Sequence, residues 1–175
     1  KPFVKHIYEE SLLGNLIDSS LVLESHGVTA INFNDNQPDA NTCLFLKKKF
    51  KNIDLAMLSY NAAGPYPSCF DDLTIEEKKS ERERILEKHL NHMCEMVNIL
   101  KPKSVLPFAG SYIIGGKNFY KNEYLGTTTW DDCADYLNSN LKCDSKIFCL
   151  RENQTFDIKN LKQEVKYERL DIKEM

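Results

Sequence analysis

The chain has 175 residues, 42% hydrophobic and 28% charged, a balance that is ordinary for a folded globular protein. Its formal net charge of −3 provides no broad basic field, which argues against a general nucleic-acid-binding role. No apolar run approaches the roughly 20 residues of a membrane-spanning helix, and no signal-peptide pattern is present. We therefore expect a cytoplasmic domain with neither nucleic acid nor a membrane as its partner.

The two ends of the chain lack obvious boundaries. The first residue is Lys1, residues 3–18 are a weakly patterned lead-in, and the chain stops in a charged segment. We expect residues 1–175 to form a single domain that is a fragment of a longer protein.

The six cysteines are scattered, and no two of them form a CxxC pair. Zinc knuckles and iron–sulfur sites need tighter spacing. We interpret the cysteines as free thiols in a reducing cytosol, most of them small core residues, with disulfides as the alternative.

The first half of the chain predicts a hairpin, a helix and a buried strand. Residues 20–25 and 28–34 are rich in strand-forming residues and flank the turn His26-Gly27, which is typical of a β-hairpin. Asn41-Thr42 indicates the N-cap of a helix that ends at Phe50. Residues 53–60 are nearly all apolar, as expected of a strand that is covered on both faces.

The longest predicted element is a helix that begins after Thr74. Thr74-Ile-Glu-Glu77 has the spacing of a capping box, and Lys101-Pro102 ends the helix. Its lysine-rich face over residues 76–88 is typical of a solvated helix surface. The expected buried stripe consists of Ile85, Leu86, Leu90, Met93, Met96, Val97 and Leu100.

The remaining elements follow from shorter patterns. The sequence predicts a strand over 104–110, a glycine-bearing loop over 111–116, an irregular segment over 117–127, a helix over 129–138, a strand over 146–150 and a charged, peripheral end over the last twenty residues.

Three strand-to-loop junctions recur at Asn34-Asp35, Tyr60-Asn61 and Ala109-Gly110. In a layered α/β domain such junctions open on one edge of the sheet, where ligands bind. Asp35 is a hard oxygen donor at a strand end and is our candidate metal ligand. The alternative is a turn residue that accepts hydrogen bonds from nearby backbone amides.

Three polar residues in the loops at this edge are candidates for substrate binding. Asn61, Tyr66 and Ser111 could contact a sugar or a nucleotide through hydrogen bonds and ring stacking. Plain loop structure is the alternative for all three.

Two further groups of polar residues have simpler interpretations. His89 and His92 are spaced i, i+3 near Cys94, whereas zinc-binding helices more often use i, i+4 histidines, so a solvated or half-buried helix face is favoured over a metal site. Asp54 begins a buried strand and is expected to cap or brace a loop.

Several of these segments occur in the order found in a known superfamily. Asp54-Leu, Ala62-Ala-Gly-Pro-Tyr-Pro67, Lys101-Pro102 and Pro107-Phe-Ala-Gly110 follow the strand that ends at Asn34-Asp35. This order resembles the second half of the metallo-β-lactamase superfamily, and more closely the metallo-β-lactamase-like domain of CMP-N-acetylneuraminate hydroxylases. The similarity covers roughly residues 18 to 160.

The resemblance implies an α/β fold, the C-terminal half of an αββα sandwich with a mixed β-sheet and packed helices. It implies a metal-dependent, hydrolase-like activity in nucleotide-sugar or sugar-acid metabolism, with a divalent zinc or iron ion as cofactor and a sugar or nucleotide sugar as substrate. Asp35 matches the family's bridging aspartate, and the HxHxDH motif would come from an upstream half of the same protein. Phe108 stands where the family has its final histidine.

Two other functions stay open. Phe108 favours a non-catalytic binding or scaffold module that kept the fold and lost its metals. A part of a Rieske-type sugar-nucleotide hydroxylase is the other alternative, and its iron–sulfur domain would need Cys and His pairs that this chain lacks.

Overall fold

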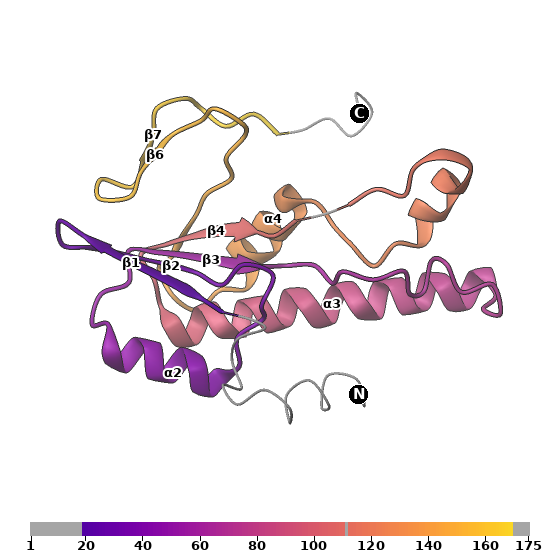
Figure 1. Cartoon of the computed structure of the whole chain (residues 1–175), viewed down its shortest axis with the longest axis horizontal. Helices are drawn as coiled ribbons and strands as arrows, with labels where there is room; N and C mark the ends of the chain where they lie inside the picture. Colours follow the sequence, from indigo (N-terminus) through magenta and orange to yellow (C-terminus); the bar gives the residue numbers. More distant parts are fainter. Residues whose placement is uncertain (1–18, 111, 170–175) are drawn as a thin grey trace.

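A computed structural model describes residues 19–110 and 112–169 of the chain, so the predicted lead-in at residues 3–18 and the candidate Ser111 lie outside the described residues. Five strands form one sheet in the order β1-β2-β3-β4-β5 (Figure 1). The first pair is antiparallel and the following pairs are parallel, so the sheet is mixed. The strands are β1 (Leu21–Ser25), β2 (Val28–Asn32), β3 (Leu55–Ser59), β4 (Ser104–Phe108) and β5 (Lys146–Ile147).

The predicted hairpin is confirmed. Ser25 pairs with Val28, which leaves His26 and Gly27 as a two-residue turn. Both turn residues have positive φ, 50° and 78°, as in the tight turns whose twist matches that of the flanking strands.

Helices connect the parallel strands. α2 (Ala40–Lys49) lies between β2 and β3, and α3 (Ile75–Leu100) between β3 and β4. After β4 come a 3₁₀ helix, η1 (Gly116–Tyr124), and then α4 (Trp130–Asn140), which packs against α3 and β4. Figure 1 shows α2 and α3 side by side along the lower face of the sheet.

Side-chain caps explain where α3 and α2 begin. The capping box of α3 is present as predicted, with Thr74 Oγ1 accepting from Glu77 N and the Glu77 carboxylate accepting from Thr74 N. The predicted N-cap of α2 at Asn41-Thr42 is wrong, because the Asp39 carboxylate accepts from Thr42 N at 2.7 Å and caps the helix two residues earlier.

The core lies between the sheet and its helices. Ile31, Ala56, Leu58 and Val105 are fully or almost fully buried and point toward α3, since alternate residues of a strand share one face. The helices contribute further buried side chains, namely Cys43, Leu46, Met93, Cys94, Met96, Val97, Leu100, Cys133 and Leu137, and the residues beside the strands contribute Phe33, Ile53 and Tyr60.

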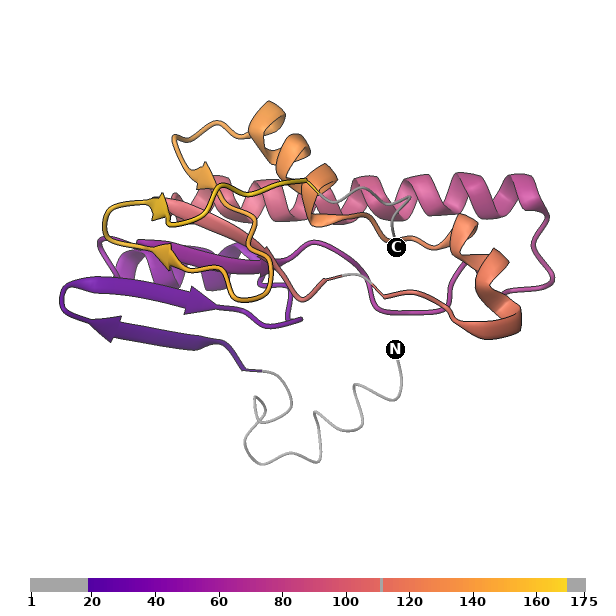
Figure 2. The ribbon, with the colours of Figure 1, turned by 90° about the horizontal axis from the view of Figure 1, so that it is seen from above.

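α3 extends well beyond the sheet. Its 26 residues span about 39 Å, whereas a five-residue strand spans about 17 Å. Its buried residues therefore begin at Met93, and the predicted stripe residues Ile85, Leu86 and Leu90 are only half-buried. Figures 1 and 2 show loops instead of strands beside the first half of the helix.

Three other predictions need correction. Residues 117–127 are not irregular, because η1 occupies most of them. The strand predicted at 146–150 is only two residues long. The end of the chain is not simply peripheral: β6 (Phe156–Asp157) pairs with β7 (Lys162–Gln163), and the Phe156 ring contacts Phe148 at 4.0 Å between centroids. This segment lies on the side of the sheet opposite α2 and α3 (Figure 2).

The fold class is therefore α/β with a mixed five-stranded sheet and helices packed on it. All six cysteines are free thiols, as predicted. Among the described residues, no helix is both long enough and apolar enough to cross a membrane.

Candidate functional site

The strands β2, β3 and β4 are parallel, so their carboxyl ends meet at one edge of the sheet. The loops that follow them carry the three predicted junctions. The first half of α3 projects past this edge and gives the loops a surface to pack on (Figure 1). The candidate site is built from these loops and from that part of α3.

Asn61 holds two of the loops together. Its side-chain amide donates to Thr128 O at 2.8 Å and accepts from Thr128 N at 2.9 Å, and the residue is 7% exposed. Both ends of this buried amide group are thus engaged in holding the fold. Asn61 therefore braces the wall of the site.

Tyr66 is bound to α3 through its hydroxyl group, which donates to Glu81 Oε2 at 2.8 Å. Glu81 also accepts from Arg84, and that contact lowers the pKa of its carboxyl group. The hydrogen bond to the Glu81 carboxylate raises the pKa of Tyr66. The Tyr66 ring meets the Phe70 ring edge-on at 5.0 Å between centroids. The hydrogen bond to Glu81 and the contact with Phe70 together fix the orientation of the Tyr66 side chain.

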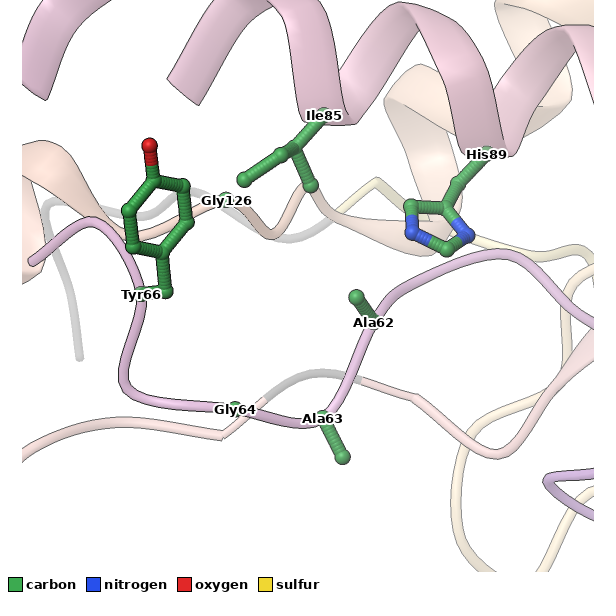
Figure 3. Close-up of a pocket in the computed structure, with 7 residues that line it drawn as sticks. All are labelled: Ala62, Ala63, Gly64, Tyr66, Ile85, His89 and Gly126. Atoms are coloured by element: carbon green, nitrogen blue, oxygen red, sulfur yellow. The ribbon is translucent and has the colours of Figure 1, made fainter. Parts of the chain in front are cut away.

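A cavity of about 190 Å³ lies between the loop that follows β3 and helix α3. Figure 3 shows Tyr66 and His89 at its two ends, with Ile85 of α3 between them. The small residues Ala62, Ala63 and Gly64 form the opposite wall (Figure 3). The cavity therefore offers two polar aromatic side chains in a mostly apolar surround, a combination that ligand sites commonly use.

The surroundings of His89 favour the neutral form of its imidazole ring. Its Nδ1 lies 2.7 Å from Gln37 Nε2, and an amide nitrogen can only donate. Nδ1 is thus the acceptor, and the ring proton lies on Nε2. Burial, with the nearby Lys88 and His92 charges, lowers the pKa of His89. The ring can act as a neutral hydrogen-bonding group.

Gly126 closes the cavity from the loop before α4. A Cβ atom at this position would lie 2.9 Å from Ile85 Cγ2, closer than side chains tolerate. The loop can approach α3 here only because the residue has no side chain.

The histidine pair braces the loop after β2. His92 Nε2 bonds Pro38 O at 2.9 Å, as His89 bonds Gln37. Both histidines are half-buried, which agrees with the half-buried helix face that the sequence favoured. They connect α3 to the loop that contains Asp35.

Asp35 lies in an exposed turn after β2, next to Asn34, which has a φ of 54°. It does not line the cavity at His89. Within residues 19–110 and 112–169, no group of three or more His, Cys, Asp or Glu side chains is placed to hold a metal ion. The described residues therefore do not fit a complete metal centre, and Asp35 offers a single carboxylate ligand.

Phe108 ends β4 and is 39% exposed. It lines a second cavity of about 340 Å³ together with Tyr60, Trp130 and Cys149. This lining is predominantly apolar, and a phenyl ring cannot coordinate a metal. Asp54 lies before β3, at the amino end of the strand, and its carboxylate accepts from Thr29 N of β2 and from Lys103 Nζ beside β4, so it braces the sheet, whereas the sequence predicted that it would cap or brace a loop.

Sequence reasoning did not assign a binding role to His89 or to Arg82, which lines a third cavity described below. Arg82 lies on the helix face that the sequence predicts to be solvated, and His89 on the face that it predicts to be solvated or half-buried. The signal that could have identified them is the length of the helix. An amphipathic helix that is longer than the strands it packs on must pack its additional turns against loops.

No protein-family model matches the chain, and no curated protein is significantly similar to it. The resemblance to the metallo-β-lactamase superfamily therefore rests on the sequence segments quoted above.

Proposed function

We propose that this chain is the substrate-binding half of a metal-dependent, hydrolase-like enzyme of the metallo-β-lactamase superfamily that acts on a sugar or nucleotide sugar. The observation that carries the proposal is the cavity at the carboxyl ends of the parallel strands, with neutral His89 and Tyr66 facing it. Open α/β sheets bind their ligands at this edge.

The chain's own residues would bind and orient the substrate. Nε2 of His89 carries a proton and can donate to a hydroxyl or carbonyl oxygen of a sugar. The Tyr66 ring offers an apolar surface, while its hydroxyl group is occupied by Glu81. The wall at Ala62 to Gly64 lets a ligand approach the backbone closely.

No step is assigned to a metal, because the described residues supply only Asp35 for it. In the proposed enzyme the remaining ligands come from the upstream half that contains HxHxDH. The full αββα sandwich is part of the same proposal.

Elemental analysis of the full-length protein tests the metal part. We expect bound zinc or iron in the wild type, a clear loss in Asp35→Asn and no loss in the control Asp144→Asn, which changes an exposed carboxylate elsewhere. A full-length protein that purifies without metal and does not take it up would defeat the metallo-enzyme form of the proposal.

Calorimetry with CMP-N-acetylneuraminate tests the substrate part. We expect His89→Gln to weaken binding by about tenfold, the equivalent of one neutral hydrogen bond. His26→Gln is the matched control, because His26 lies in the exposed hairpin turn. Equal affinities for the two variants would contradict a role for His89.

Phe108 at the final-ligand position favours a second candidate, a binding module without catalysis. A protein that binds the nucleotide sugar, contains no metal and leaves the ligand unchanged would establish that candidate. An iron–sulfur absorbance in the full-length protein would instead support the hydroxylase alternative.

A further inference from the structure

A third cavity, of about 380 Å³, lies farther along the projecting half of α3. Arg82 of α3, the segment from Tyr112 through η1, and the residues that lead into α4 surround it. Its size falls in the range of roughly 300–1,000 Å³ that is typical of small-molecule sites.

Arg82 is the unusual group in this cavity. Its Nε atom is enclosed by protein and has no hydrogen-bond partner among the described residues. Three basic side chains of α3 and η1 do have carboxylate partners: Lys79 pairs with Glu123, Arg84 with Glu81, and Lys121 with Asp71. In the described part of the chain no carboxylate forms an ion pair with Arg82.

The enclosed Nε–H group of Arg82 is costly without an acceptor, and the rest of this half-buried guanidinium group has no ion-pair partner among the described residues. Its planar fork of N–H donors matches a carboxylate or a phosphate better than any other side chain does. Arg82 thus points to an anionic group as the ligand of this cavity.

Large apolar side chains surround the same cavity and are exposed. Tyr112 is 36%, Ile113 60% and Phe119 64% exposed. Clustered exposed apolar groups beside a charged group indicate a binding surface, and aromatic rings favour a flat partner. The ligand should therefore carry a ring as well as a charge.

The wall of the cavity is held in place before any ligand arrives. The Asn122 side chain accepts from Ile114 N at 2.8 Å and donates to Ile114 O at 2.9 Å and to Phe119 O at 2.6 Å. These bonds fix the loop that carries the aromatic residues. A preformed wall lowers the entropic cost of binding.

Asp132 also lines the cavity and would repel an anion if its charge were uncompensated. Its carboxylate accepts from the hydroxyl groups of Thr128 and Thr129 and from Arg169 Nη2 at 2.8 Å. Arg169, which also pairs with Asp135, offsets part of this negative charge.

We infer that this cavity binds a small organic anion, a phosphate or carboxylate attached to a planar ring, with the charge at Arg82 and the ring against Tyr112 and Phe119. The inference goes beyond the proposed function, because it requires neither a metal nor hydrolysis.

Calorimetric titration of the full protein with phenyl phosphate and with benzoate, which share the same ring, tests the inference, and the tighter binder identifies the anionic group. We expect at least one of them to bind with a Kd below about 1 mM, and we expect phenol and inorganic phosphate to bind at least about tenfold more weakly. Arg82→Gln should weaken binding by about 10- to 100-fold, as the loss of a charge-assisted hydrogen bond does. Lys88→Gln, which removes an exposed charge from the same helix, is the control.

Phe119→Ala tests the contribution of the ring contacts apart from that of the Arg82 charge. Phe119 is exposed, so the change should leave the fold intact. It should weaken the binding of the ring-bearing anion and leave that of inorganic phosphate unchanged. The inference is overturned if both ring-bearing anions bind more weakly than about 1 mM. It is also overturned if Arg82→Gln binds like the wild type, if Lys88→Gln loses as much affinity, or if phosphate binds as tightly as the larger anions.

Discussion

Asp54 joins three neighbouring strands, and its replacement by asparagine should measure how strongly one buried carboxylate holds them together. The residue is 3% exposed and lies just before β3. Its Oδ2 accepts from Thr29 N of β2 at 2.8 Å, and its Oδ1 accepts from Lys103 Nζ, beside β4, at 2.7 Å. Asparagine has the same shape, but its NH₂ group must face one of these two donors.

The two bonds do not contribute equally. The Lys103 side chain is 57% exposed, so solvent screens this ion pair to about 0–1 kcal/mol. The Thr29 N–H group is buried, and a buried donor without an acceptor costs about 1–3 kcal/mol. Asparagine can keep its oxygen on the Thr29 N–H group and turn its NH₂ group toward Lys103, so we expect Asp54→Asn to lower the free energy of unfolding by about 1 kcal/mol, or Tm by roughly 2–4 °C.

The effect should depend on pH in one direction. Burial by itself raises the pKa of Asp54, but the hydrogen bonds from Lys103 and from Thr29 N outweigh it, so the pKa lies below its ordinary value of 3.8. The carboxylate therefore stabilises the folded state at pH values above about 3.8. This contribution is lost as the pH falls through the lowered pKa.

Urea unfolding at pH 7 and over a series of pH values below 4 would measure both quantities. Asp144→Asn, at an exposed position, controls for the change in net charge. A difference below about 0.5 kcal/mol between wild type and Asp54→Asn at pH 7 would refute the reasoning, since surface substitutions have effects of that size. A difference that stays constant in acid would refute its electrostatic part.

Three further predictions concern local packing and chemistry. Gly126→Ala should lower the free energy of unfolding by about 1–3 kcal/mol, because the new Cβ lies 2.9 Å from Ile85 Cγ2; in an Ile85→Ala background the same change should cost clearly less, and equal costs would contradict the clash. Thr74→Ala should cost about 1 kcal/mol in urea unfolding through loss of the helix cap, whereas Thr74→Ser should retain most of it. In the native protein a thiol reagent should modify Cys69 well before Cys133, because Cys133 is fully buried and burial raises the pKa of its thiol; modification at equal rates would show that the core opens readily.

The elements that were predicted well depend on neighbouring residues only. The hairpin turn at His26-Gly27 and the capping box at Thr74 are set by backbone conformation and hydrogen bonds within a few residues. The N-cap of α2 was missed by two residues because Asp39, Asn41 and Thr42 are all good capping residues, and only the observed bond from Thr42 N to Asp39 decides among them.

The amino-acid sequence by itself determined the α/β class and the order of the main strands and helices, because periodicity and capping act locally. It also indicated the free cysteines, through the spacing between them. Tertiary structure alone decided the sites. Asn61 meets Thr128 67 residues away, and Gln37 meets His89 52 residues away. Arg82 looks like any other charge on a solvated helix until the chain brings Tyr112 and Phe119 beside it and leaves it without a counter-charge. Such sites depend on contacts between distant segments, for which a local pattern contains no signal.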